Sequence, residues 1–246
     1  MSDPRSVAKI GVLVPFTNTN LEPDLTQMCP PGCTLHFQRM GGYDVDEIPG
    51  ADQMAGLGAS DISHDLRMIA GVRPDVVLYG CTSATLTHGP AFDRDLASRI
   101  KAGSGALSFT AAGALVASIQ AVGACHVGFS SPYVGEINDQ AVRFLAENGI
   151  ETVKRADIGR DLGNYGQGEL TPDEVYDLAL KANNAKVQAI VLSCTDMRSV
   201  EAIPRIEAAI GKPVISSNQA LMFATCKALR LERRANLPGT LFDHLQ

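Results

Sequence analysis

Short apolar runs alternate along this chain with longer segments in which apolar residues recur every three or four positions. A continuous apolar run of roughly four to six residues is typical of a strand buried on both faces of a parallel sheet, and the longer spacing is typical of an amphipathic helix. The runs predict strands over Ile10–Pro15, Leu35–Met40, Val76–Tyr79, Ala106–Phe109, His126–Ser130, Ile150–Ala156, Ala189–Leu192 and Val214–Ser216. The spacing predicts helices over Met54–Ile69, Asp93–Ile100, Ala111–Ala121, Ile137–Asn148, Pro172–Asn183, Ser199–Ile210 and Asn218–Leu229. Thr171 and Glu174 are expected to form a capping box at the start of the helix from Pro172, and the polar tail from Glu232 is expected to dock loosely.

The order of these elements repeats in the two halves of the chain. Gly11–Pro15 corresponds to Val127–Pro132, Val76–Tyr79 to Ala189–Leu192, and Leu107–Thr110 to Val214–Ser217. Alternating strands and helices favour parallel sheets, so the repeat predicts an α/β fold of two pseudo-symmetric, doubly wound parallel-sheet halves. We place an N-terminal half at 1–122 and a C-terminal half at 123–246, and the last helix, 218–230, could pack back on the first half. The active site is expected in the cleft between the halves, at the carboxyl ends of the strands.

Two matching cysteine turns follow corresponding strands. Val76–Tyr79 runs into Gly80-Cys81-Thr82-Ser83, and Ala189–Leu192 runs into Ser193-Cys194-Thr195-Asp196. The two cysteines are separated by close to half the length of the chain, as a duplicated fold would give. One thiol from each half would then face a shared cleft.

The residue types in these turns suit proton transfer or addition at a carbon atom next to a carboxylate. Backbone N–H groups and the hydroxyls of Thr82, Ser83, Tyr133 and Thr195 would hold the carboxylate and stabilise charge that develops on it. A helix N-terminus is expected after each turn, where it would favour the anion and lower the thiol pKa. One thiolate could then act as nucleophile or base and the other thiol as acid, with no cofactor and no metal.

Composition limits the partners. The net charge is −6 and no basic run occurs, which argues against nucleic acid and anionic membranes. No apolar run approaches the ~20 residues needed to span a bilayer, and the N-terminus lacks a signal-peptide core, so a cytoplasmic location is expected. Cys29 and Cys33 lack a second Cys or His pair nearby, so we expect no zinc site there.

The motifs resemble those of the aspartate/glutamate racemase superfamily, in the branch that holds maleate cis–trans isomerases and arylmalonate decarboxylases. The segment Val14-Pro15-Phe16-Thr17-Asn18-Thr19-Asn20-Leu21-Glu22 is similar to the isomerases' Val-Pro-Ser-Ser-Asn-Thr-Thr-x-Glu, and the two cysteine turns are similar to the family's catalytic turns. Ser131-Pro132-Tyr133 resembles a carboxylate-binding tyrosine segment, and Asn164 lies in a loop where the isomerases carry a second substrate-binding Asn.

The resemblance implies roles for these residues. Cys81 would attack the alkene of a substrate such as maleate, and Cys194 would handle the proton. Asn18, Thr82, Ser83, Tyr133, Asn164 and Thr195 would bind the substrate. A homodimer or homotetramer is the assembly that the family implies.

Three alternatives stay open at this level. Thr-Ser after Cys81 also resembles an ectoine-utilisation branch, which would make the protein a racemase or epimerase of an amino acid derivative or a hydantoin. Arylmalonate-type decarboxylation is disfavoured because those enzymes have glycine where Cys81 stands. A non-catalytic binding protein would need a charged clamp, typically an arginine, and neither turn has one beside its cysteine.

Overall fold

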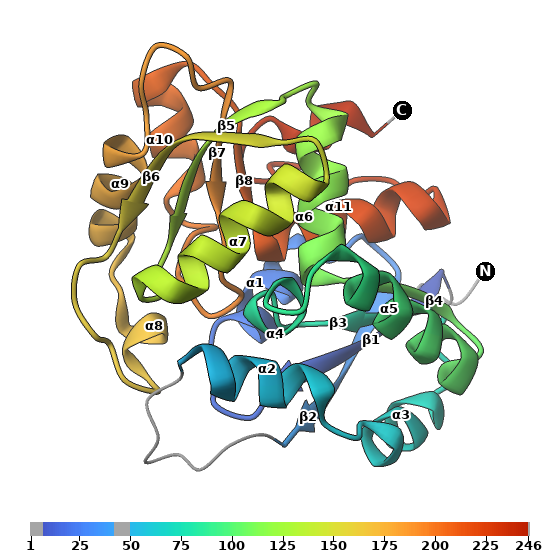
Figure 1. Cartoon of the computed structure of the whole chain (residues 1–246). Coiled ribbons are helices and arrows are strands. Elements are labelled where there is room, and N and C mark those ends of the chain that lie inside the picture. The colour runs from blue at the N-terminus through green and yellow to red at the C-terminus, as the bar shows by residue number, and fades with distance from the viewer. Residues whose placement is uncertain (1–6, 42–49, 246) are drawn as a thin grey trace.

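The computed structural model describes residues 7–41 and 50–245, which form two four-stranded parallel sheets (Figure 1). The first sheet has the order β2-β1-β3-β4 and the second the order β6-β5-β7-β8. The strands are β1 (Ala8–Pro15), β2 (Cys33–Met40), β3 (Val76–Tyr79), β4 (Leu107–Thr110), β5 (His126–Ser131), β6 (Glu151–Asp157), β7 (Ala189–Leu192) and β8 (Val214–Ser216). The identical order in both sheets confirms the predicted repeat and the α/β fold class.

Helices cover both sheets. They are α1 (Leu21–Met28), α2 (Ala51–Ala59), α3 (Ser63–Ala70), α4 (Ser83–Leu86), α5 (Pro90–Ser104), α6 (Ala111–Ala121), α7 (Gly135–Glu147), α8 (Gly166–Glu169), α9 (Pro172–Lys181), α10 (Ile203–Ile210), α11 (Ser217–Leu229) and the 3-10 helix η1 (Leu241–His244). Across the described residues, none of these helices is long and apolar enough to cross a membrane.

The burial of the central strands explains why the sequence has continuous apolar runs at these positions. Every residue of β3 and of β7 is buried, because each strand pairs on both sides and is covered by helices on both faces. β1 and β3 are paired in parallel, as are β5 and β7. Their carboxyl ends therefore lie at the same edge of each sheet, and the cysteine turns leave from that edge.

The last helix of each half packs against the other half. α6 and α11 lie side by side (Figure 1), α11 also contacts β4, and α6 contacts β8. Both helices are lined with small and apolar residues, and all residues of α11 from Ser217 to Cys226 are buried. These contacts join the two halves through one continuous core.

Several boundaries differ from those predicted. The predicted helix Met54–Ile69 is two helices, α2 and α3, because the backbone at Ser60 is extended and not helical. The predicted helix Ser199–Ile210 begins only at Ile203. The tail does more than dock loosely, since Leu241 and Phe242 are buried in the core. The capping box between Thr171 and Glu174 is confirmed, with both of its backbone hydrogen bonds present.

Candidate active site

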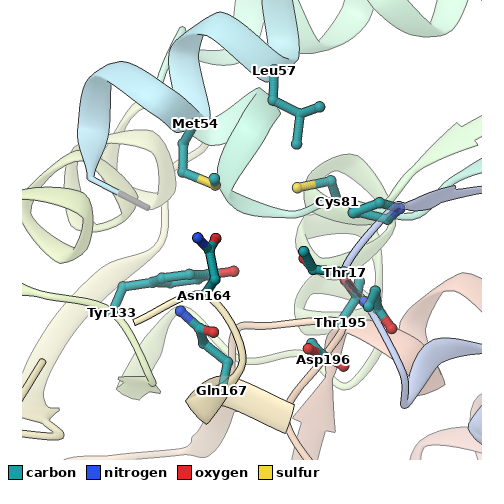
Figure 2. A pocket seen from close by; sticks show the side chains of 11 residues that line it. Thr17, Met54, Leu57, Cys81, Tyr133, Asn164, Gln167, Thr195 and Asp196 are labelled. Carbon is teal, nitrogen blue, oxygen red and sulfur yellow. Dashed lines mark hydrogen bonds between the residues drawn. The ribbon is translucent and has the colours of Figure 1, made fainter. Parts of the chain in front are cut away.

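A small cavity lies between the two halves, at the carboxyl ends of the strands (Figure 2). Its volume, counted as the space open to the centres of water molecules, is about 40 Å³, which is more than one water molecule needs. The lining residues are Pro15, Thr17, Asn18, Met54, Leu57, Cys81, Tyr133, Asn164, Gln167, Thr195 and Asp196.

Cys81 borders this cavity at the turn between β3 and α4. The turn is tight because Gly80 is packed closely, and a Cβ there would lie 2.8 Å from the carbonyl oxygen of Leu13. The Sγ atom lies 3.6 Å from the hydroxyl of Ser83. Burial raises the pKa of the Cys81 thiol, while the N–H groups of Ala84 and Ser83 at the start of α4 lower it, and burial dominates.

Cys194 occupies the corresponding turn after β7 but is not among the residues that line the cavity. Its Sγ lies 3.2 Å from the hydroxyl of Tyr133 and accepts a hydrogen bond from the backbone N–H of Asp196 at 3.3 Å. Burial and then the nearby Asp196 carboxylate raise the pKa of Cys194 to about 12. The thiol is therefore neutral in this state of the pocket.

Ser83 and Tyr133 connect the two cysteines. The Ser83 hydroxyl donates to the Tyr133 oxygen at 3.2 Å, so Cys81, Ser83, Tyr133 and Cys194 form one chain of polar contacts. Burial raises the pKa of Tyr133 well above its ordinary value, followed by the two cysteines. The phenol consequently stays protonated and can donate to a Cys194 thiolate.

Asn18 and Thr195, both predicted as substrate-binding residues, join the halves beneath the cavity. The Asn18 amide donates to the Thr195 hydroxyl at 3.0 Å, and that hydroxyl donates to the carbonyl oxygen of Gly80 at 2.8 Å. The Asn18 side-chain oxygen accepts from the backbone N–H of Leu21 at 2.9 Å. The side chains of Asn18 and Thr195 together thus connect the second cysteine turn, the first cysteine turn and the start of α1.

The other predicted binding residues fall into two groups. Asn164 lines the cavity just before α8, and its role in substrate binding stays a prediction. Thr82 and Ser83 do not line it: the Ser83 hydroxyl donates to Tyr133, and the Thr82 hydroxyl donates to Ser217 at the start of α11 at 2.8 Å. In this structure the Thr82 hydroxyl therefore lies in the interface between the two halves.

The expectation of a helix N-terminus after each cysteine turn is right for the first turn only. α4 begins at Ser83, but the chain after Cys194 continues as turns and bends until α10 begins at Ile203. The expectation that both thiol pKa values are lowered is also wrong for this closed pocket, because desolvation by burial outweighs the local N–H donors.

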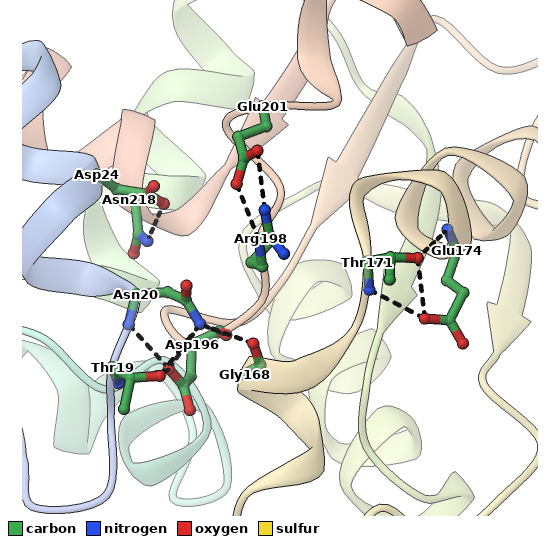
Figure 3. A network of polar contacts seen from close by, with 10 residues as sticks. All are labelled: Thr19, Asn20, Asp24, Gly168, Thr171, Glu174, Asp196, Arg198, Glu201 and Asn218. Atoms are coloured by element: carbon green, nitrogen blue, oxygen red, sulfur yellow. Dashed lines mark hydrogen bonds and ion pairs between the residues drawn. The ribbon is translucent and has the colours of Figure 1, made fainter.

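Asp196 is the charged residue of the cavity, and it is held by the other half of the chain (Figure 3). Its Oδ1 accepts hydrogen bonds from the backbone N–H groups of Thr19 at 2.8 Å and Asn20 at 3.1 Å. The Asn20 amide also donates to the Asp196 carbonyl oxygen at 2.8 Å and to that of Gly168 at 3.1 Å. Burial raises the pKa of Asp196, and these donors oppose the shift.

Sequence reasoning missed the residues that shape the pocket from outside the turns. Met54 and Leu57 project from α2 toward Cys81, and Gln167 projects from α8 (Figure 2). Helical periodicity placed the first two in a predicted helix, but it could not show that their side of α2 borders a cavity. Among the described residues no cluster of metal-ligating side chains occurs, and Arg198 pairs with Glu201 at 2.9 Å.

Comparisons with known proteins place this geometry in context. Residues 10–242 match a family model described as arylmalonate decarboxylase. The chain is 25% identical over 251 residues to a maleate isomerase of Geobacillus stearothermophilus, covering 96% of this chain and 97% of the relative. The maleate isomerase of Pseudomonas putida S16, solved with maleate, is 26% identical with a TM-score of 0.89 over 97% of this chain and 98% of the other. A Nocardia farcinica maleate cis–trans isomerase bearing a covalent succinylcysteine intermediate shares the fold at 23% identity and a TM-score of 0.86, over 96% of this chain and 98% of the other.

Proposed function

This chain belongs to the arylmalonate decarboxylase family, and within it we propose that the protein is a cofactor-independent isomerase that uses two cysteines on a small carboxylic acid. The reaction we propose is cis–trans isomerisation of the maleate-to-fumarate type. The maleate isomerase relatives match nearly the whole length of this chain, and they support this choice.

The observation that carries the proposal is the continuous contact chain from Cys81 through Ser83 and Tyr133 to Cys194. Two cysteines that follow corresponding strands of two halves would be an ordinary core feature if nothing joined them. Here hydroxyl groups that can donate and accept protons lie between the two sulfurs, and Cys81 borders the cavity. Nucleophile and acid are thus placed on one site.

The steps follow from these positions. The Cys81 thiolate forms a bond to one alkene carbon, and the electron pair of the double bond moves to the neighbouring carbon and into its carboxylate. The Cys194 thiol gives its proton to that carbon, which leaves a saturated adduct on Cys81. Rotation about the new single bond follows. The Cys194 thiolate then takes the proton back, the C–S bond breaks, and the trans product leaves.

The electrostatics support these two roles. Asp196 and burial keep Cys194 protonated, as an acid must be before it donates. Once it has donated, the Tyr133 hydroxyl and the Asp196 N–H stabilise the thiolate. Burial raises the pKa of Cys81 as well, but the N–H groups at the start of α4 and the Ser83 hydroxyl favour its thiolate. The Nocardia farcinica isomerase, with its succinylcysteine, is a precedent for an adduct of this kind.

We propose a cytoplasmic homodimer or homotetramer that acts without nucleic acid or membrane partners. The net charge of −6 argues against polyanionic partners. Light scattering after size-exclusion chromatography would give the oligomeric state directly.

The test is proton NMR in D₂O with the metal-free protein and, separately, maleate and its monoamide, maleamate. A trans product from either, lost by several orders of magnitude in Cys81→Ser and in Cys194→Ser, is the expected result. Cys226→Ser is the matched control, since Cys226 is equally buried and lies outside the cavity. Full turnover in either active-site variant would remove the two-cysteine mechanism. Deuterium exchange at the α-carbon of chiral amino acid derivatives, with no trans product, would establish racemisation instead.

A further inference from the structure

The walls of the cavity differ sharply in character. Met54 and Leu57 form an apolar wall on the α2 side, and Asp196 and Gln167 lie on the opposite side (Figure 2). Among the described residues that line the cavity, none is Lys, Arg or His. A carboxylate next to Cys81 and Tyr133 can be held by neutral donors. The other end of the same small molecule then meets the apolar wall, the Asp196 carboxylate, or the neutral amides of Asn164 and Gln167.

A second substrate carboxylate finds no cation among the described residues of this lining, and only neutral side chains such as Asn164 and Gln167 could donate to it. Beside Met54 and Leu57 it would lose its hydration with no partner in return. Beside Asp196, which is buried, it would meet a like charge. Arg198 is two residues from Asp196 in sequence, but its guanidinium makes two hydrogen bonds to Glu201, at 2.9 and 3.1 Å.

The Asp196 carboxylate also has capacity for a donor. Each hydrogen bond that the described residues give this carboxylate goes to Oδ1, from Thr19 and Asn20. These contacts fix the position of the side chain, while Oδ2 lies beside Gly168, where a Cβ would come within 3.0 Å of it. A fixed acceptor that borders the cavity is suited to an N–H group of a ligand.

We propose that Asp196 is a specificity-determining residue that selects a substrate with one carboxylate and an N–H donor, such as a primary amide or an ammonium group, at its other end. This inference rests on the proposed function, because it names the kind of acid on which that site acts. It makes the dicarboxylate a poorer ligand of this protein than its monoamide.

The test compares two ligands that differ by one functional group. About pH 8 is well above the ordinary pKa range of carboxyl groups. Both carboxyl groups of maleate are therefore ionised at this pH, so maleate carries two charges and maleamate carries one. Binding is measured by calorimetry, because the chain has no Trp to report binding by its fluorescence. The Cys81→Ser background prevents turnover during the titration.

The expected result is that maleamate binds at least about tenfold more tightly than maleate, as the cost of juxtaposed like charges implies. Adding Asp196→Asn should reduce this ratio about tenfold or more, mainly by tightening maleate binding. Asn keeps an oxygen that can accept from Thr19 and Asn20, so the fold should survive. Asp95→Asn is the control, because it removes the same charge from an exposed side chain on α5.

The possible results distinguish a failure of the inference about Asp196 from a failure of the proposed function. Equal or tighter binding of maleate, or a ratio unchanged by Asp196→Asn, overturns the inference whatever the turnover experiment gives. If the Asn variant does not fold, the preference measured with Asp196 in place decides alone. A clear monoamide preference with no isomerisation of either ligand overturns the proposed function and leaves the selectivity of Asp196 standing. If neither ligand binds, both are overturned.

Discussion

The side-chain amide of Asn18 donates a hydrogen bond of 3.0 Å to the hydroxyl of Thr195, which lies in the other half of the chain. The same side chain accepts from the backbone N–H groups of Asn20 and Leu21. Since both residues are buried, the position of the second cysteine turn relative to the first depends on this bond.

Asn18→Ala should therefore affect stability and activity together. It removes the donor to the Thr195 hydroxyl and the acceptor of the buried Leu21 N–H, whereas the Asn20 N–H keeps Asp196 as acceptor. The expected cost is about 1–3 kcal/mol in the free energy of unfolding. Thr195→Val removes only the bond between the two side chains and that to Gly80. A double-mutant cycle by urea unfolding should give a coupling of about 0.5–1.5 kcal/mol. Additive effects of the two substitutions would show that the bond carries no free energy.

Tyr133→Phe should lower kcat far more than it raises KM. The substitution removes the oxygen that contacts both Ser83 and Cys194, and with it the donor to the Cys194 thiolate. The loss of one positioned proton donor typically costs about 10²–10⁴-fold in rate. Tyr165→Phe, on a side chain that is 54% exposed, is the control and should be neutral. The comparison uses steady-state kinetics with maleate or maleamate, whichever is turned over faster. An unchanged kcat would exclude Tyr133 from the proton path.

Asp24 predicts a pH dependence of stability. Its carboxyl is buried and accepts from the Asn218 amide at 2.7 Å, and burial raises its pKa to about 7. Because the folded-state pKa is above the unfolded value of about 4, the native state binds this proton more tightly. The stabilisation is complete below about pH 4 and is lost as the pH rises through 7, by up to about 4 kcal/mol.

The measurement is the urea midpoint at about pH 5 and about pH 8 for the parent and for Asp24→Asn. The variant has no charge to bury, so its stability should fall less than that of the parent over this range. Asp95→Asn serves again as the exposed control. Parallel pH curves for the parent and Asp24→Asn would show that this carboxyl does not titrate as inferred.

Gly168→Ala should weaken substrate binding with little effect on the fold. A Cβ at this position would lie 3.0 Å from both Asp196 Oδ2 and Thr19 Oγ1, so α8 must move away from the second cysteine turn. We expect KM to rise about tenfold, in line with about 1.4 kcal/mol of lost binding. Gly135→Ala is the matched control, since a Cβ there meets nothing within 4 Å. A KM equal to that of the parent would show that α8 does not need this close approach.

The strands and cysteine turns could be predicted because their signals are local. β3 and β7 are apolar throughout because both of their faces are covered, and the order of strands in a parallel sheet places their carboxyl ends together. The positions of Cys81, Asn18 and Thr195 around one cleft followed from that rule. Their catalytic and binding roles stay predictions until the variants are measured.

Other features depend on contacts that one sequence does not display. α1 was not predicted, although Pro23 lies in its first turn, where the N–H that proline lacks would have no intrahelical partner. The apolar spacing continues from Met54 to Ile69 across the break at Ser60, so periodicity alone joins α2 and α3. The pairing of Asp196 with Thr19 and Asn20 joins positions more than 170 residues apart.

The exchange of the last helices between the halves bears on how such a chain arose. α6 lies against α11 and β8, and α11 lies against α6 and β4, so the contact between the halves has the reciprocal form of an isologous dimer interface. A half-length ancestor would have left the apolar surface of its last helix in water as a monomer. As a two-fold homodimer it would have covered that surface with the same helix of its partner copy. Gene fusion would then have allowed the two cysteine turns to change independently.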